Sequence, residues 1–282
     1  MKLEVTQILQ DRTKQETTVY LKGCPLRCPW CDRPQVRKPK KELLYDAQSC
    51  IECMVCFPAC PTDAHELINS LHLVDRYKCI GCMVCADLCP AGALEPASQT
   101  MQTDEIIVRC QKTLILGGGE PLVHHDAVLE LLQKAKDKGL TTCIETTGAF
   151  YPSQIPAILP YTDLFVFRIM DTDPQRMKKN TGAKLEVLLS NLKKIDEAGG
   201  KTRLLCKLIP GINTDDEHTK NLAALVAGLK NCQGIQPEGY VPADPMKWKM
   251  LDLTPPQFPA MKKEELDGFV SALQAAGATV IL

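Results

Sequence analysis

A duplicated cysteine motif constrains this chain more than any other feature of its sequence. Residues 50–64 read CIECMVCFPACPTDA and residues 79–93 read CIGCMVCADLCPAGA, so an offset of 29 residues aligns four cysteines, a Met-Val pair and a Cys-Pro end. Each half has the spacing C-x2-C-x2-C-x3-C-P of a [4Fe–4S] cluster loop, in which the fourth cysteine ligates the other cluster. The repeat therefore predicts one cluster on Cys50, Cys53, Cys56 and Cys89 and a second on Cys60, Cys79, Cys82 and Cys85. Zinc, which takes four ligands in pairs, fits this pattern poorly.

The composition narrows the class of protein. The chain has 282 residues, 15 cysteines and a net charge of −1, and it has no stretch that reads as a secretory signal or a membrane span. We therefore expect a soluble, cytoplasmic protein that binds neither nucleic acid nor membrane. Four further cysteines, at positions 110, 143, 206 and 232, are scattered, and the two that lie within strand-like runs, Cys143 and Cys206, are expected to be buried and inert.

Outside the repeat, short apolar runs alternate with amphipathic stretches. Strands are expected at residues 17–21, 111–116, 141–145, 163–169 and 203–209 and near 234–240, and most of them are followed by a helical pattern. This alternation favours a parallel sheet of βαβ units, and about six units fit, fewer than a closed eight-stranded barrel needs. The fold class expected is α/β, a partial (β/α)6 open parallel barrel formed by residues 1–39 and 101–282. Residues 40–100 would be an inserted bacterial-ferredoxin-like domain with two [4Fe–4S] clusters.

A third cysteine set, in the segment LKGCPLRCPWCDRP (residues 21–34), has the spacing C-x3-C-x2-C and no fourth cysteine of its own. A [4Fe–4S] cluster on Cys24, Cys28 and Cys31 would leave one iron open to an exogenous ligand. The alternatives are a structural cluster and a set of redox thiols.

Other candidate features follow the later strands, at the carboxyl edge where parallel sheets bind ligands. They are the segment GGGEP (117–121), the segment ETTG (145–148) and Arg168. Glycines let a backbone approach a ligand closely.

The proline-rich stretch 237–259 is expected to lack regular structure and to be either a lid over the barrel or a solvated connector.

The C-x3-C-x2-C spacing resembles the signature of the radical S-adenosylmethionine (SAM) superfamily, in which the amino and carboxylate groups of SAM bind the open iron. The GGGEP segment resembles that superfamily's motif for the SAM amino group. The chain as a whole resembles the activating enzymes of glycyl radical enzymes, typified by pyruvate formate-lyase activase. The resemblance rests on the order of the insert and the segments after it, which are ILGGGEPL, ETTG, DPQRMKKNTG, LIPGIN and Lys247-Trp248. The resemblance covers roughly residues 5–282.

This resemblance implies three [4Fe–4S] clusters, SAM, a 5′-deoxyadenosyl radical and removal of hydrogen from a glycine of a partner enzyme. A flavodoxin or ferredoxin would donate electrons under anaerobic conditions, and the protein would be a monomer. No side chain need act as acid or base, because the cluster and SAM carry the chemistry. The residues expected at the SAM site are Trp30, which would pack on adenine, and Gly117, Gly118, Gly119, Glu120, Glu145, Thr146 and Arg168.

The chain departs from the family pattern at several functional positions. Residues 11–16 and 32–34 differ near the expected partner contact, and Arg168, Met170 and Val241 stand where the family has Asp, Lys and His. We hypothesise that Arg168 grips the SAM carboxylate bidentately in place of a cation, the Asp and the Lys. The alternative is an ion pair of Arg168 with Asp171 or Asp173. Two further functions stay open: radical chemistry on another protein, a peptide or a small molecule, with altered SAM cleavage, and a non-enzymatic polycluster electron carrier.

Overall fold

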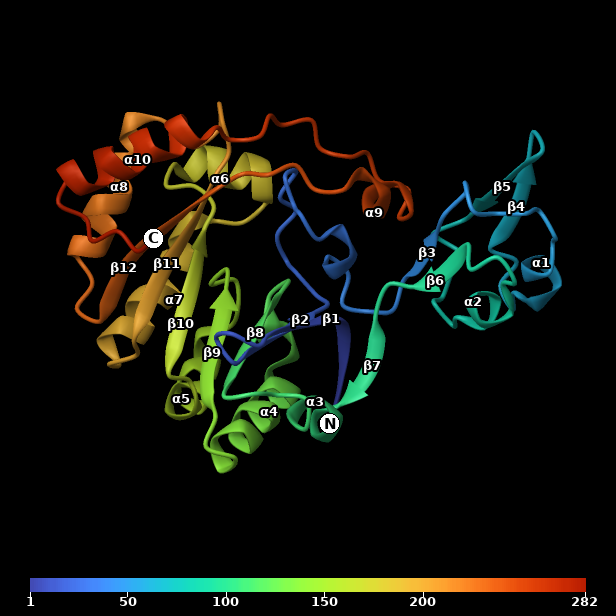
Figure 1. Cartoon of the computed structure of the whole chain (residues 1–282), viewed down its shortest axis with the longest axis horizontal. Coiled ribbons are helices and arrows are strands. Elements are labelled where there is room, and N and C mark those ends of the chain that lie inside the picture. Colours follow the sequence, from blue (N-terminus) through green and yellow to red (C-terminus); the bar gives the residue numbers. More distant parts are fainter.

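The computed structural model describes residues 1–282 and has one large sheet with the strand order β12-β11-β10-β9-β8-β2-β1-β7. Six neighbouring strands are parallel: β2 (Glu16–Leu21), β8 (Thr113–Gly118), β9 (Thr141–Thr146), β10 (Leu164–Ile169), β11 (Thr202–Leu208) and β12 (Cys232–Gly239). The partial six-stranded barrel is confirmed. Two strands that the sequence analysis missed, β1 (Lys2–Asp11) and β7 (Gln99–Gln102), extend it antiparallel at the edge next to the insert (Figure 1).

Helices cover the outside of the barrel, and all but the first of them follow a parallel strand (Figure 1). They are α3 (Thr103–Ile107), α4 (His125–Asp137), α5 (Ile155–Ile158), α6 (Pro174–Thr181), α7 (Leu185–Glu197), α8 (Asp216–Ala227) and α10 (Lys263–Ala275). Short 3-10 turns lie at η1 (Pro34–Val36), η2 (Pro121–His124), η3 (Pro152–Gln154) and η4 (Leu159–Tyr161). None of the helices is long and apolar enough to traverse a bilayer.

The faces of the strands alternate between the outer core and the barrel interior. Phe165 and Phe167 of β10 pack with the helices in the main hydrophobic core. The intervening Val166 packs instead with Cys143 and Leu205 in a small inner cluster. Because side chains two residues apart share a face, Arg168 follows Val166 into the interior at the carboxyl end of β10.

The insert consists of two small antiparallel sheets and two short helices and projects from the β7 edge of the barrel (Figure 1). One sheet pairs β3 (Leu43–Tyr45) with β6 (Leu94–Pro96), and the other pairs β4 (His65–Ile68) with β5 (Leu71–Val74). The helices α1 (Cys56–Ala59) and α2 (Val84–Leu88) both begin within the cysteine motifs. Each half of the sequence repeat thus contains one helix, and the strands that flank it pair with those that flank the other half.

The segment between β12 and α10, residues 240–262, crosses over the carboxyl end of the barrel toward the insert (Figure 1). Contrary to expectation it contains a helix, α9 (Pro245–Lys249), which begins at the proline that follows the capping side chain of Asp244. Arg76 of the insert donates a hydrogen bond to the Met250 carbonyl at 2.7 Å. The segment therefore packs against the insert instead of lying free in solvent.

Candidate active site

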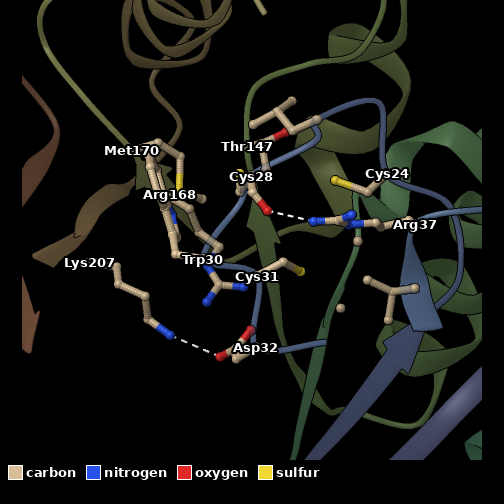
Figure 2. A pocket seen from close by; sticks show the side chains of 14 residues that line it. Cys24, Cys28, Trp30, Cys31, Asp32, Arg37, Thr147, Arg168, Met170 and Lys207 are labelled. Carbon is tan, nitrogen blue, oxygen red and sulfur yellow. Dashed lines mark hydrogen bonds and ion pairs between the residues drawn. The ribbon is translucent and has the colours of Figure 1, made fainter. Parts of the chain in front are cut away.

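The cysteines of the loop 24–31 lie in one pocket above the carboxyl end of β2. Figure 2 shows Cys24, Cys28 and Cys31 around a common space. The pocket encloses about 550 Å³ of space between atoms, part of which is open to solvent. Its lining comes from the cysteine loop and from four strand ends: Cys24, Leu26, Cys28, Trp30, Cys31, Asp32, Val36, Arg37, Gly118, Gly119, Thr147, Arg168, Met170 and Lys207.

Close backbone packing joins the cysteine loop to the glycine segment after β8. A Cβ atom on Gly119 would lie 2.1 Å from the Gly23 carbonyl oxygen, so only glycine fits there. Gly118 has a φ of +107°, a conformation that other residues rarely adopt. The Glu120 amide donates to the same Gly23 carbonyl at 2.7 Å. The glycines therefore hold the cysteine loop against the end of β8.

Glu120 has a different place from the one predicted. Its carboxylate is fully buried outside the pocket, where it accepts hydrogen bonds from Thr146 Oγ, from the Thr147 amide and hydroxyl, and from the Leu122 amide. Burial raises the pKa of Glu120, and these donors oppose that rise. Its side chain is therefore not an acceptor exposed to a ligand. It fixes the loops after β8 and β9, which bring Gly118, Gly119 and Thr147 to the pocket.

Of the other predicted residues, Trp30 and Arg168 line the pocket, whereas Gly117, Glu145 and Thr146 do not. Trp30 is 2 % exposed, and its ring meets Phe258 of the crossing segment edge-on at 6.0 Å. Its Nε1 is buried without a hydrogen-bond partner. A buried, unpaired donor beside a cavity is costly unless a ligand or water satisfies it.

Arg168 extends into the pocket near Cys31 (Figure 2). The alternative ion pairs are absent, because Arg176 binds Asp171 through two nitrogens, at 2.9 and 3.0 Å, and Asp173 caps α6. Burial alone would lower the pKa of Arg168, but the nearby carboxylates, with Glu145 first, raise it. The guanidinium has no hydrogen-bond partner among the protein's own groups, so it is free to bind an anionic ligand.

Lys207 and Asp32 close one side of the pocket. Lys207 Nζ lies 2.9 Å from Asp32 Oδ2 and 3.9 Å from Glu238 Oε1. Burial favours the neutral form of Asp32, but Lys207, together with Arg168 and Arg33, lowers the pKa of that carboxyl. The sequence analysis did not single out Lys207 or Arg37, and it included Thr147 only within ETTG and Met170 only as a departure from the family pattern. The period of β11 could have indicated Lys207, because it lies two residues after Leu205, the register partner of Arg168.

The chemistry of the donor set tests whether an iron–sulfur cluster fits here. Burial raises the pKa of Cys24 to about 12 and also raises that of Cys28 and Cys31. The dry site therefore disfavours free thiolates, whereas a bound metal deprotonates coordinating thiols outright. Arg37, which donates to the Cys28 carbonyl at 2.6 Å, and Arg168 place positive charge around the three sulfurs. The residues present fit a cluster with three cysteine ligands.

The eight cysteines of the insert form the two sets predicted from the repeat. Cys50, Cys53, Cys56 and Cys89 line one cavity. The other set consists of Cys85 and its neighbours Cys79, Cys82 and Cys60. Burial raises the pKa of Cys85 to about 11, and these three neighbours add to that rise. The Cys60 sulfur accepts a hydrogen bond from the Ala64 amide at 3.3 Å, so backbone donors also face a ligand sulfur. Both sets suit closed four-cysteine clusters.

Comparison with known proteins decides the family. The model of the radical SAM superfamily matches residues 76–224, more than half of the chain, and that of the 4Fe-4S dicluster domain matches residues 42–90. The chain belongs to the radical SAM superfamily. The (2S)-3-sulfopropanediol sulfolyase activating enzyme of Bilophila wadsworthia is 34% identical over 230 residues, which is 76% of each chain. The indoleacetate decarboxylase activating enzyme of Tractidigestivibacter scatoligenes is 31% identical over 75% of this chain and 73% of that one.

These relatives place this radical SAM enzyme among the activating enzymes of glycyl radical enzymes. Its fold is also similar to that of a radical SAM methyltransferase from Sphaerobacter thermophilus, with a TM-score of 0.56 over 97% of this chain and 67% of that one at 15% identity. The iron–sulfur and SAM cofactors follow from the two family models. The superfamily match begins downstream of the cysteine loop 24–31, so the roles of individual residues there depend on the geometry described above.

Proposed function

We propose that this radical SAM enzyme generates a glycyl radical on a partner protein, using a cluster held by Cys24, Cys28 and Cys31 and SAM bound in the pocket beside them. The observation that carries the proposal is the pocket itself, which combines three cysteines, a backbone edge of two glycines and an unpaired guanidinium. The bound cluster and SAM would together supply a 5′-deoxyadenosyl radical, which takes hydrogen from a glycine of the partner.

The chain's own residues would orient SAM and keep water out. Arg168 is suited to grip the SAM carboxylate, because its guanidinium is free and lies near Cys31. Gly118 and Gly119 would let the ligand approach the backbone. Trp30 would contact the adenine, and Phe258, which packs on it, belongs to the segment that crosses the barrel end.

The insert would carry electrons to this site. With both of its cysteine sets filled, the protein would hold three [4Fe–4S] clusters in all. A flavodoxin or ferredoxin would be the donor, and we expect the protein to act as a monomer. The contacts of Arg76 and α9 hold the insert against the segment that crosses the active site, which would keep the distance between clusters constant.

A second candidate keeps the radical chemistry and changes the target to another protein, a peptide or a small molecule. It is favoured by the ion pair of Asp32 with Lys207, which occupies the side of the pocket next to the cysteine loop. Asp32 is one of the positions that differ from the family pattern near the expected partner contact, and such a difference would alter which target fits.

A binding experiment tests the role of Arg168. Loss of a charge-assisted bidentate contact costs about 2–3 kcal/mol, so Arg168→Ala should weaken SAM binding about 30- to 150-fold, and Arg168→Lys should recover part of it. Arg203→Ala is the matched control. Arg203 lies near the amino end of β11, outside the pocket, and donates to Gln233. Unchanged SAM affinity in Arg168→Ala would refute the assignment.

The partner is tested by electron paramagnetic resonance. The reduced protein, SAM and a candidate glycyl radical enzyme are mixed anaerobically, and the proposal expects the doublet of a glycyl radical. If several candidates give no doublet while SAM is still cleaved, the second candidate function is correct instead.

A further inference from the structure

Two buried histidines lie beside the first cysteine set of the insert. His65 on β4 and His72 on β5 are each 6 % exposed. His65 Nδ1 and His72 Nε2 are 2.8 Å apart, which is a short hydrogen bond. Neither residue has a part in the SAM site, so their burial calls for a separate explanation.

The pair is directed at the sulfur atoms of the cysteine set. His72 Nδ1 lies 3.6 Å from Cys50 Sγ, and His72 lines the same cavity as the four cysteines. The ring is enclosed by Tyr45, at 4.6 Å between centroids, and by Phe57, at 5.2 Å. This enclosure fixes the ring plane and leaves the sulfur as the partner of Nδ1.

The neighbours determine which nitrogen of His72 carries its proton. The hydrogen bond between the two rings has one donor and one acceptor, so only one of the two facing nitrogens carries the proton of that bond. A cysteine sulfur bound to iron has no proton and can only accept. His72 therefore presents Nδ1–H to Cys50 and accepts at Nε2 from the Nδ1–H of His65. The opposite tautomer would set a ring lone pair against the sulfur.

The second cysteine set lacks this arrangement. At the repeat offset of 29 residues, His72 corresponds to Leu43 and His65 to Leu94. These leucines pack with Cys85 of the second set in one apolar cluster. Two otherwise similar cluster sites thus differ at the same pair of positions, polar in one and apolar in the other.

We propose that His72, held by His65, donates a hydrogen bond to the Cys50 sulfur and raises the reduction potential of the first insert cluster above that of the second. The reduced cluster carries one more negative charge than the oxidised one, so a donor to its sulfur stabilises the reduced form more. The first cluster is then the better electron acceptor of the two. This role needs the clusters of the insert and does not depend on SAM chemistry.

A separate metal ion at Cys56, His65 and His72, whose donor atoms all lie within 4.8 Å of one another, does not fit the contacts. Cys56 belongs to the first cluster set. The facing nitrogens of the two histidines are joined by their own hydrogen bond, so they cannot both present a lone pair to a metal.

A potentiometric titration of the cluster-loaded full chain, followed by electron paramagnetic resonance, tests the proposal. His72→Phe keeps an aromatic ring between Tyr45 and Phe57 but removes the donor. This substitution should lower the reduction potential of the first cluster by about 59 mV. At a fixed potential, that change raises the ratio of oxidised to reduced cluster about tenfold for a one-electron couple. His72→Asn, whose amide can reach the place of Nδ1, should restore much of the shift. Leu43→Phe, at the matching position beside the second cysteine set, should leave the first cluster unchanged.

The proposal would be overturned if the first cluster had the same reduction potential in the wild type and in His72→Phe. It would also be overturned if His72→Asn shifted that potential as much as His72→Phe does. A second measurement needs no variant. In wild-type protein labelled with ¹⁵N-histidine, hyperfine spectroscopy of the reduced clusters should detect a weakly coupled nitrogen and an exchangeable proton. No coupling, or the strong coupling of a direct iron ligand, would contradict it. Cleavage of SAM is independent of these outcomes, so a failure here is distinct from a failure of the proposed function.

Discussion

Replacement of Glu120 is the sharpest test of how the fold builds the SAM pocket. The carboxylate is 0 % exposed and accepts from the backbone amides of Leu122 and Thr147, at 3.2 and 2.8 Å, and from two threonine hydroxyls. In Glu120→Ala the hydroxyls can turn to other acceptors, but the two amides stay buried and unpaired. Each unsatisfied donor costs about 1–3 kcal/mol, so we expect a loss of about 3 kcal/mol.

For a chain of this size, 3 kcal/mol lowers the melting temperature by about 6–12 °C. The assay is thermal unfolding of the cluster-loaded protein under anaerobic conditions, together with SAM affinity, which should fall because Gly118 and Gly119 lose their support. Glu120→Gln should be intermediate, since it keeps one acceptor oxygen. Glu186→Ala, on the exposed face of α7, is the control and should leave the melting temperature nearly unchanged. If Glu120→Ala melts with the wild type and binds SAM as well, the reasoning is wrong.

Three further predictions follow from single contacts. Gly119→Ala brings a Cβ atom to 2.1 Å from the Gly23 oxygen, so it should lower iron content and abolish the SAM-dependent cluster signal while the insert signals remain. Arg176→Ala leaves the fully buried Asp171 without its cation and should cost about 3 kcal/mol in thermal unfolding; a change under 1 kcal/mol would refute this. Burial lowers the pKa of His218 to about 4, below its unfolded value of about 6.5, so its contribution to stability is lost as pH falls through that window. From pH 7.5 to 5.5 the loss should be about 1 kcal/mol, and His218→Asn should lack it.

The sequence predicts most of the fold because its periodic signals are local. Strands such as β9 and β10 are compact apolar runs bounded by polar residues, and helix α4 has an amphipathic period that ends near Gly139. The repeat spacing also predicts which cysteines meet, because the crossing of the fourth cysteine is a property of the motif. The edge strand β7 was missed because its pairing partner β1 lies almost 100 residues away in the chain, whereas β1, which also pairs with the neighbouring β2, was missed for no such reason.

The candidate site was only partly predictable, because its side chains are selected by long-range contacts. The sequence indicates a carboxylate in GGGEP but not that the Thr146 and Thr147 donors turn it away from the pocket. Likewise, the ion pair of Asp32 with Lys207 joins residues 175 positions apart. No local pattern specifies such a pair, although the alternation of β11 restricts the face on which Lys207 lies.

The products of SAM cleavage test the central claim most directly. The cluster-loaded protein is reduced anaerobically with SAM, and the fragments are identified by mass spectrometry, with Cys28→Ala as the control that should remove one cluster ligand from the pocket. The account predicts 5′-deoxyadenosine and methionine from the wild type and neither from Cys28→Ala. Absence of 5′-deoxyadenosine from the wild type, or cleavage of a different carbon–sulfur bond, would contradict it.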